Sequence, residues 1–320
     1  MHEEFGTPRT KDEKIESLIH QYVDGGLHRR DLIRRLARLA GGSAAALMLL
    51  ETAGLAQVQP PVNADDVRVS ENDPAIEWKN VTFPGKAGSV LGLLAYPRPF
   101  ARVARRRADN FAGPQPGVLV VHENRGLLEH LRDVTRRMAK AGFVALGIDL
   151  LSRQGGTGAF ANDTALSQAY GRTLQDERYD DMVSGIEFLK RQENVVADRI
   201  GAVGFCAGGG NIYYGIYNQM PLQAAVPFYG TPPNPLPAVT VTTPVLGIFS
   251  ETDRNQAARI ASLADSLVAA RVTFGVHVFK GTAHAFFNDT GAVYNRVAAI
   301  EAWAKTIDFL NTHLRAPRTA

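Results

Sequence analysis

The stretch Gly204-Phe205-Cys206-Ala207-Gly208-Gly209-Gly210 decides which fold we expect for this chain. It follows an apolar run at 200–205 that is typical of a buried strand, and a helix-like segment comes after it. A nucleophile between a strand and a helix, with glycine two positions before and two after, is the pattern of a nucleophile elbow. The turn is so tight that bulk at those two positions would block close passage of the chain. The stretch therefore predicts Cys206 as a nucleophile.

The setting of Cys206 favours chemistry over a structural role. The partial positive charge of the helix N-terminus favours the thiolate, which is the reactive form of cysteine. A lone cysteine is usually a small buried hydrophobe, but that alternative has to explain four glycines at elbow spacing. Cys206 is the only cysteine in 320 residues, so an intramolecular disulfide and a Cys-based zinc site are excluded.

The segments around the elbow indicate a mainly parallel sheet of the α/β class, covered by helices on both faces. Apolar runs predict two antiparallel strands at 76–83 and 89–97, and further strands at 117–122, 143–149, 200–205, 224–229, 245–250 and 273–279. Helical stripes lie at Leu128, Leu131 and Met138 and, in the last helix, at Val297, Ile300, Ala304, Ile307 and Leu310. Active sites of such sheets form at the carboxyl ends of the strands.

An elbow predicts an acid and then a histidine later in the chain. Asp253 follows the strand expected at 245–250, and His284 lies beyond the next strand, so both loops leave the same edge of the sheet as Cys206. His284 is expected to take the thiol proton, and Asp253 to hold the imidazole in the right tautomer. Glu251 is an alternative acid. His277 lies inside a predicted strand and is expected to be structural.

The loop 122–126, His-Glu-Asn-Arg-Gly, carries a further set of polar groups. It does not have the HExxH spacing of a zinc site, so no metal is expected there. In elbow enzymes an N–H group of this loop and the N–H group after the nucleophile form the oxyanion hole. Here these are Asn124, or a neighbour, and Ala207. On physical grounds alone, Glu123 is equally well an acid at a helix start or a catalytic group.

Composition and the N-terminal segment limit the partners and the location. A net charge of +3 with dispersed basic residues does not indicate nucleic-acid binding. Residues 1–56 resemble a twin-arginine export signal, because Arg29-Arg30 precedes a stretch rich in Ala, Gly and Leu and then small residues. This predicts export to the periplasm, without stable membrane insertion after processing. The alternative is an amphipathic helix retained on a cytoplasmic enzyme. Residues 57–75 are expected to be a linker and 76–320 the catalytic domain.

At these motifs the chain resembles the dienelactone hydrolase family over about residues 80–314. The resemblance rests on 122–126, on 204–210 and on the pair Asn288-Asp289. It implies an α/β-hydrolase fold, a Cys-His-Asp triad, a small-molecule ester or lactone substrate, and no metal or organic cofactor. It also implies a role for Glu123, since the matching acid of the family contacts the nucleophilic cysteine and helps to generate the thiolate.

Family members that cleave dienelactone hold the substrate carboxylate with two arginines. Arg153 matches the first, which implies a substrate-binding role; a charge on a surface loop is the alternative. The second position falls at Phe287-Asn288, where this chain has no arginine. A neutral amide does not replace a bidentate arginine. The resemblance therefore implies ester or lactone hydrolysis. The missing second arginine, which is a departure from the family pattern, speaks against dienelactone itself as the substrate.

Two functions of other classes are alternatives to hydrolysis. A non-catalytic binding protein on a hydrolase scaffold would be expected to lack a triad member, and none is missing. A redox-sensing thiol would have no resolving cysteine, so its oxidation would stop at a sulfenic acid or a mixed disulfide. Labelling by iodoacetamide near neutral pH separates a low-pKa thiol from an inert one.

Overall fold

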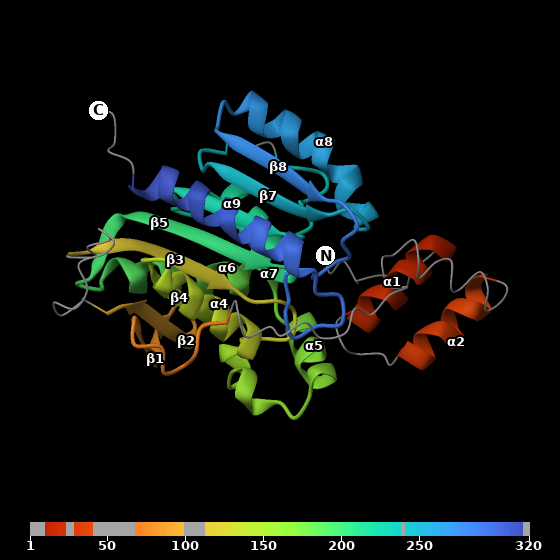
Figure 1. Cartoon of the computed structure of the whole chain (residues 1–320), viewed down its shortest axis with the longest axis horizontal. Helices are drawn as coiled ribbons and strands as arrows, with labels where there is room; N and C mark the ends of the chain where they lie inside the picture. The colour runs from red at the N-terminus through yellow and green to blue at the C-terminus, as the bar shows by residue number, and fades with distance from the viewer. Residues whose placement is uncertain (1–9, 24–28, 41–67, 99–112, 238–240, 316–320) are drawn as a thin grey trace.

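The computed structural model describes residues 10–23, 29–40, 68–98, 113–237 and 241–315. These residues form one eight-stranded sheet flanked by helices (Figure 1). The strands are β1 (Ile76–Gly85), β2 (Gly88–Pro97), β3 (Gln115–Val121), β4 (Val144–Asp149), β5 (Val195–Phe205), β6 (Ala224–Phe228), β7 (Val245–Ser250) and β8 (Phe274–Phe279). The helices are α1 (Lys11–Val23), α2 (Arg29–Ala40), α4 (Glu129–Lys140), α5 (Asp163–Gly171), α6 (Gln175–Lys190), α7 (Ala207–Tyr217), α8 (Arg254–Ala269) and α9 (Arg296–Arg315), with short 3₁₀ turns η2 (Ser152–Gln154) and η3 (Thr157–Ala159).

The strand order is β1-β2-β4-β3-β5-β6-β7-β8. β1 pairs antiparallel with β2, and β2 pairs antiparallel with β4, while the other neighbours are parallel. The expected mainly parallel sheet with two antiparallel strands is thus confirmed. β5 starts at Val195, five residues before the predicted start. The prediction missed these residues because polar Asp198 and Arg199 interrupt the apolar pattern. The register between β3 and β5 shifts at Pro116/Gly117, which accommodates the extra residues.

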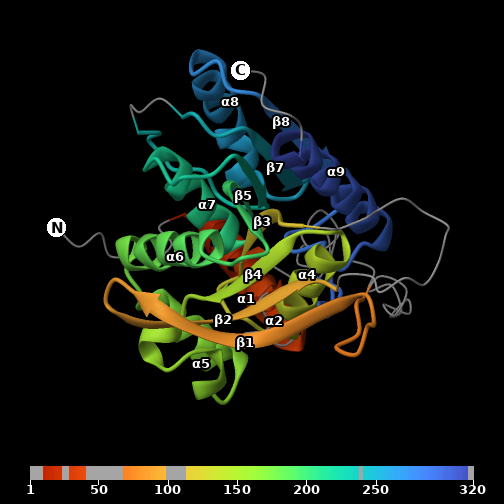
Figure 2. The same ribbon diagram turned by 90° about the vertical axis from the view of Figure 1, so that its left-hand side faces the viewer.

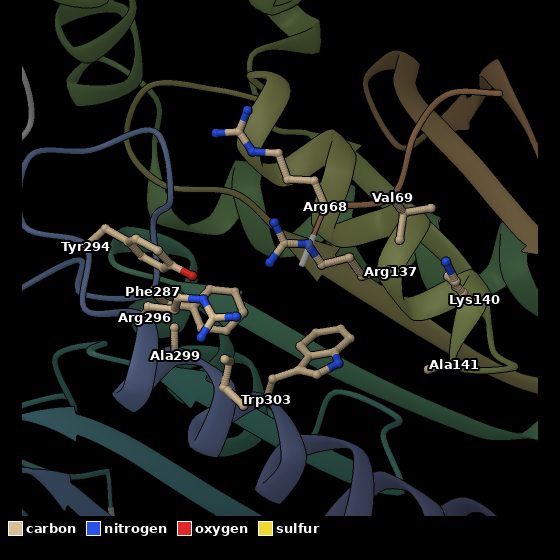
Figure 3. Close-up of a pocket in the computed structure, with 11 residues that line it drawn as sticks. Arg68, Val69, Arg137, Lys140, Ala141, Phe287, Tyr294, Arg296, Ala299 and Trp303 are labelled. Carbon is tan, nitrogen blue, oxygen red and sulfur yellow. The ribbon is translucent and has the colours of Figure 1, made fainter. Parts of the chain in front are cut away.

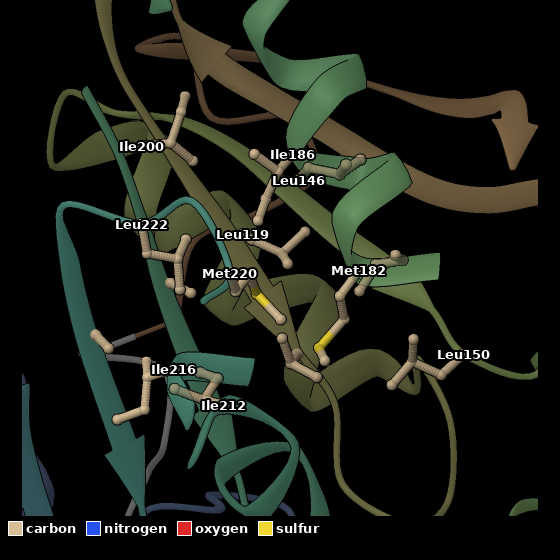
Figure 4. Packing of buried hydrophobic residues seen from close by; sticks show 14 of the residues in the cluster. Leu119, Leu146, Leu150, Met182, Ile186, Ile200, Ile212, Ile216, Met220 and Leu222 are labelled. Carbon is tan, nitrogen blue, oxygen red and sulfur yellow. The ribbon is translucent and has the colours of Figure 1, made fainter. Parts of the chain in front are cut away.

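Two apolar layers cover the two faces of the sheet. Figure 2 shows α4 and α9 on one side and α6 and α7 on the other. Met182 and Ile186 of α6 pack with Leu119 and Leu146 of the sheet, as Figure 4 shows. β3 and β4 are buried along their whole length, which explains why they read as continuous apolar runs. Because the core holds the strands rigidly, the loops at their carboxyl ends have fixed starting points.

The predicted buried stripe of α9 is wrong in part. Val297 is 76% exposed and Ile300 is 41% exposed, whereas Ala302 and Leu310 are fully buried. The helix turns its small side chains to the sheet, and Gly201 of β5 leaves the room that Leu310 needs. A Cβ at Gly201 would stand 3.1 Å from Leu310. The close approach of the helix to the sheet therefore outweighs the hydrophobicity of the larger residues.

The two N-terminal helices, α1 and α2, pack against each other. They do so through Ile15, Leu32 and Leu36, and Ala283 from the loop after β8 belongs to the same apolar cluster. Residues 41–67 of the expected export signal and linker lie outside the described residues, so export stays a prediction. Among the helices that the structure describes, none is long and apolar enough to cross a membrane.

The end of the expected linker packs on the large domain. Val69 is 5% exposed and belongs to an apolar cluster with the sheet and α4. Its backbone N–H donates a hydrogen bond of 2.7 Å to Asp133. Residues 68–75 are therefore held by contacts of their own before β1 begins.

Candidate active site

Cys206 stands between β5 and α7 in a strained turn. Its φ of 54° lies in the left-handed region, which is costly for a residue with a side chain. A Cβ at Gly204 would lie 2.4 Å from the carbonyl oxygen of Gly208, and one at Gly208 would lie 2.4 Å from that of Val121. The two glycines are thus required by close backbone contacts on both sides of the turn. The side chain of Cys206 is partly exposed.

The two backbone amides expected in the oxyanion hole, those of Asn124 and Ala207, follow the carboxyl ends of two neighbouring strands, β3 and β5. Ala207 is the first residue of α7, so its N–H is one of those that a helix leaves without an intrahelical acceptor. Asn124 lies in the loop after β3, and β3 pairs directly with β5. Both residues therefore lie at the same edge of the sheet. Their role as donors to an oxyanion stays a prediction.

His284 and Asp253 form a buried pair at the same edge of the sheet. His284 Nδ1 lies 2.9 Å from Asp253 Oδ2 and 3.1 Å from Oδ1. Ser250 Oγ donates a further hydrogen bond of 2.6 Å to Asp253 Oδ2. With a carboxylate as its partner, Nδ1 carries a proton, which makes Nε2 the ring atom suited to proton exchange with a substrate or a thiol.

The electrostatic surroundings of His284 connect it to Cys206. Burial lowers the pKa of His284, but the charges of Asp253 and Cys206, with hydrogen bonds to both, raise it well above its usual value. Both contacts therefore favour the protonated imidazole. The contact with Cys206 then favours the thiolate form, because a neighbouring imidazolium stabilises the negative charge on sulfur.

Glu123 is a buried carboxylate held from two sides. Asn288 Nδ2 donates a hydrogen bond of 3.0 Å to Glu123 Oε2, and the guanidinium of Arg125 lies 3.9 Å from the same oxygen. The Oδ1 atom of Asn288 accepts hydrogen bonds from the backbone and the side chain of Thr290, which fixes the orientation of its amide. Glu123 Oε1 is buried and has no hydrogen-bond partner among the described residues. One oxygen is therefore anchored and the other is available for chemistry.

His122 joins two loops of the site. It is fully buried, its Nε2 accepts a hydrogen bond of 2.8 Å from the backbone of Leu150, and its Nδ1 lies 2.5 Å from the carbonyl oxygen of Glu123. Burial lowers the pKa of His122, so the ring is neutral with its proton on Nδ1. The residue therefore links the loop after β3 to the loop after β4.

The described residues contain no group of three or more His, Cys, Asp or Glu side chains that could hold a metal ion.

Tyr229 is a residue of the site that the sequence did not single out. It follows β6, is fully buried, and has a φ of 36°, which is unusual for a bulky side chain. Its ring centroid lies 5.0 Å from that of His284. Burial, followed by the charges of Glu123 and Cys206, raises the pKa of Tyr229 well above its usual value. The sequence carries no local signal for this role beyond the place of Tyr229 at the end of the strand next to the elbow strand.

Arg153 is engaged by an acid of the protein itself. Its Nε and one terminal nitrogen donate hydrogen bonds of 3.1 and 2.9 Å to the two carboxylate oxygens of Asp181 on α6. The side chain of Asp181 is 3% exposed and that of Arg153 is 20% exposed. The bidentate geometry leaves Arg153 partly open to solvent but with its charge compensated. Its contact with a substrate stays a prediction.

Glu251, the alternative acid, and His277, which was expected to be structural, have other partners. Glu251 is exposed, and its carboxylate accepts a hydrogen bond of 2.7 Å from the backbone of Gly281. His277 lies 3.4 Å from Glu301 of α9. Asp253, and not Glu251, is thus the acid at His284 Nδ1.

Comparisons with known proteins show which family the chain resembles. A model of the dienelactone hydrolase family matches residues 102–314. A Synechocystis protein named as a carboxymethylenebutenolidase is 31% identical over 252 residues, which cover 73% of this chain and 96% of the relative. A Bradyrhizobium protein named as a 2-oxo-3-(5-oxofuran-2-ylidene)propanoate lactonase is 29% identical over 261 residues, or 77% of this chain and 97% of the relative.

Solved structures show the same fold. The crystal structure of a dienelactone hydrolase from Klebsiella pneumoniae superposes with a TM-score of 0.62 at 25% identity, covering 74% of this chain and 98% of the other. The α/β-hydrolase fold expected from the elbow is therefore confirmed.

Proposed function

Because the chain belongs to the dienelactone hydrolase family, and is therefore a hydrolase of ester or lactone bonds, we propose that it works through a Cys206-His284-Asp253 triad and a thioester intermediate. The observation that carries this proposal is the environment of His284. Asp253 binds its Nδ1 at 2.9 Å, and Cys206 helps to raise its pKa. A histidine held in this way beside a cysteine at an elbow is the arrangement that activates a thiol.

In the first half of the reaction, the thiolate of Cys206 attacks the carbonyl carbon of the substrate. The electron pair of the C=O bond moves to oxygen, and the N–H groups of Ala207 and Asn124 bind the resulting oxyanion. When the C=O bond re-forms, the C–O bond to the leaving group breaks. The protonated Nε2 of His284 gives its proton to the leaving alkoxide, which leaves a thioester on sulfur. In a lactone the released alcohol stays attached to the acyl group.

In the second half, water completes the hydrolysis. His284 Nε2 takes a proton from water while the water oxygen attacks the thioester carbonyl. The C–S bond then breaks, the acid product leaves, and Cys206 returns to the thiolate paired with protonated His284. Asp253 stays ionised throughout and stabilises the imidazolium.

Glu123 is proposed to assist in forming the thiolate. This is the role that the family resemblance implies for the acid at this position. Its buried Oε1, which has no hydrogen-bond partner among the described residues, supports the assignment. The anchored Oε2 keeps the carboxylate in one orientation, because the Asn288 amide is itself fixed by Thr290.

The charges around the site support an uncharged ester or lactone as the substrate. Glu123 and Asp253 place two carboxylates near the nucleophile, and each is 5% exposed. The charge of Arg153 is compensated by Asp181. Asn288, which stands where the resemblance leads us to look for a second arginine, is neutral. A substrate carboxylate would meet no uncompensated cation among these residues, whereas Arg153 can still offer hydrogen bonds to a neutral group.

Turnover of a neutral aryl ester tests the proposal. We expect Cys206→Ala in the full chain to lower kcat/KM for p-nitrophenyl acetate by about a thousandfold or more, with an unchanged melting curve. Cys206→Ser should keep the fold and alter the rate. A folded Cys206→Ala protein with full activity would contradict the triad. Rapid labelling of the wild type by iodoacetamide without any turnover would support a redox thiol instead.

A further inference from the structure

A cavity of about 490 Å³ lies between α4 and α9, on the face of the sheet opposite α6 and α7 (Figure 3). Aromatic side chains form much of its wall. Phe287 and Trp303 have ring centroids 6.1 Å apart, and Tyr294 lies beside them in Figure 3. A volume of this size suits a small organic molecule, and flat rings favour a flat apolar ligand.

Basic side chains complete the lining of this cavity. Arg68, Arg137, Lys140 and Arg296 all contribute to it, and no acidic side chain is among its described lining residues. Two buried acids, Asp133 and Asp289, pair with the arginines; their side chains are 3% and 1% exposed, and Asp133 accepts a hydrogen bond of 2.7 Å from Arg137 Nε. Asp289 accepts a hydrogen bond of 3.2 Å from Arg68 Nε and another from Arg137. Arg68 and Arg137 are thus held in the cavity wall by an ionic framework, which is the set of ion pairs that they form with Asp289 and Asp133.

Tyr294 lies in the cavity wall together with the arginines. Burial and Asp289 raise the pKa of Tyr294, while Arg137, Arg296 and Arg68 act to lower it. The positive charge of these arginines therefore reaches the part of the wall that Tyr294 forms. Planar guanidinium donors gathered around a phenol can bind a carboxylate in a bidentate way, with an additional hydrogen bond from the phenol.

We propose that this cavity is a second ligand site, which binds an aromatic carboxylate apart from Cys206. The ring of the ligand would lie against the partly exposed Trp303 and Tyr294, and its carboxylate would face Arg68 and Arg296. Neutral aromatic molecules would gain the stacking but not the charge-assisted hydrogen bonds. The site is thus selective for the anion.

The cavity and the catalytic site share one short segment but lie on different sides of it. Phe287 lines the cavity, and its ring packs on Phe205 and Phe228 at centroid distances of 5.3 and 5.1 Å. The next residue, Asn288, turns to the catalytic side and binds Glu123. Aromatic packing therefore separates the two sites, so closing the site at Cys206 should leave the cavity accessible.

Calorimetry with naphthoate as the probe tests this proposal. The full chain is first alkylated at Cys206 with iodoacetamide, so that the catalytic site is blocked. We expect saturable binding of naphthoate, and at least about tenfold weaker binding of the neutral analogue naphthamide, because a charge-assisted contact is lost. No saturable heat, or equal affinity for the two probes, would overturn the proposal.

Variants then locate the binding. Arg68→Gln combined with Arg296→Gln should weaken naphthoate binding by about tenfold or more, whereas the exposed control Arg172→Gln should leave it unchanged. Ile300→Glu, which places an acid at the partly exposed edge of the cavity, should weaken naphthoate binding without touching the ionic framework. Wild-type affinity in the folded Ile300→Glu protein or in the double variant would show that naphthoate binds elsewhere.

Discussion

Asn288 donates a hydrogen bond of 3.0 Å to Glu123, and both side chains are buried beside the catalytic loop. The hydrogen-bond donor to this carboxylate is therefore a neutral amide, while the guanidinium of Arg125 lies 3.9 Å from the same oxygen. An arginine at this place would neutralise Glu123 and could also attract an anionic substrate. The amide carries no charge and does neither.

Asn288→Ala should lower both activity and stability. The change removes the hydrogen bond to Glu123 and leaves a buried carboxylate oxygen without its donor, which costs about 1–3 kcal/mol of unfolding free energy. We expect kcat for a neutral aryl ester to fall by about tenfold, because Glu123 is no longer held in one orientation. Urea unfolding and steady-state kinetics measure the two effects. The exposed control Asn72→Ala should match the wild type, and a kcat equal to that of wild type in Asn288→Ala would contradict the role of this contact.

Matched substrates should reveal the preference for uncharged molecules. We expect kcat/KM for the methyl ester of dienelactone to exceed that for dienelactone itself by at least about tenfold, because Arg125 and Arg153 are already paired with acids of the protein and would not compensate the free carboxylate. Competition kinetics with both substrates in one reaction give the ratio directly. Equal values, or a preference for the anion, would argue against the neutral-substrate proposal while leaving ester hydrolysis intact.

Tyr229→Phe should reduce kcat by about tenfold with little change in KM. The buried hydroxyl stays protonated, since burial and neighbouring charges raise the pKa of Tyr229, and it can donate only to the groups around it. A suitable control is Tyr179→Phe, which removes a hydroxyl bonded to the backbone of Asn218 outside the site. Similar kcat values for both variants would assign Tyr229 a purely structural role.

The raised pKa of His284 should appear in the pH dependence of stability. Burial opposes the shift, but Asp253 and Cys206 raise the pKa well above the usual value of about 6.5. The folded state then binds this proton more tightly than the unfolded state does. The contribution to stability is fully present below about pH 6.5 and is lost as pH rises through the folded-state pKa.

Comparison of the wild type with His284→Gln isolates this contribution from those of other groups. We expect the difference in unfolding free energy between the two proteins to be largest in mildly acidic urea solutions and to shrink as pH increases. A difference that grows with pH would mean that the pKa of His284 is lowered in the folded protein.

Much of the fold could be predicted because most strands are buried on both faces. Continuous apolar runs such as β3 and β4 are easy to recognise, and the order Cys206, Asp253, His284 follows the order of the strands. The buried face of α9 was harder to predict, since periodicity alone does not show that Gly201 admits a closely packed helix. The early start of β5 was hidden by its polar residues.

The contacts that shape the site were beyond the sequence because they join distant residues. Asn288 and Glu123 are 165 positions apart, and Arg153 meets Asp181 only because α6 packs beside the loop after β4. The position of Tyr229 depends on a left-handed turn that no local pattern predicts. Residue types therefore indicated the chemistry, while packing determined the partners of each group.

Intact-protein mass spectrometry shows directly whether Cys206 is the nucleophile that carries the acyl group. The full chain is mixed with a slowly deacylating aryl ester, quenched in acid, weighed and mapped by peptide digestion. We expect a mass increase of a single acyl group, located on Cys206 and absent from the Cys206→Ala protein. An acyl group on any other residue, or the same mass increase in Cys206→Ala, would contradict it.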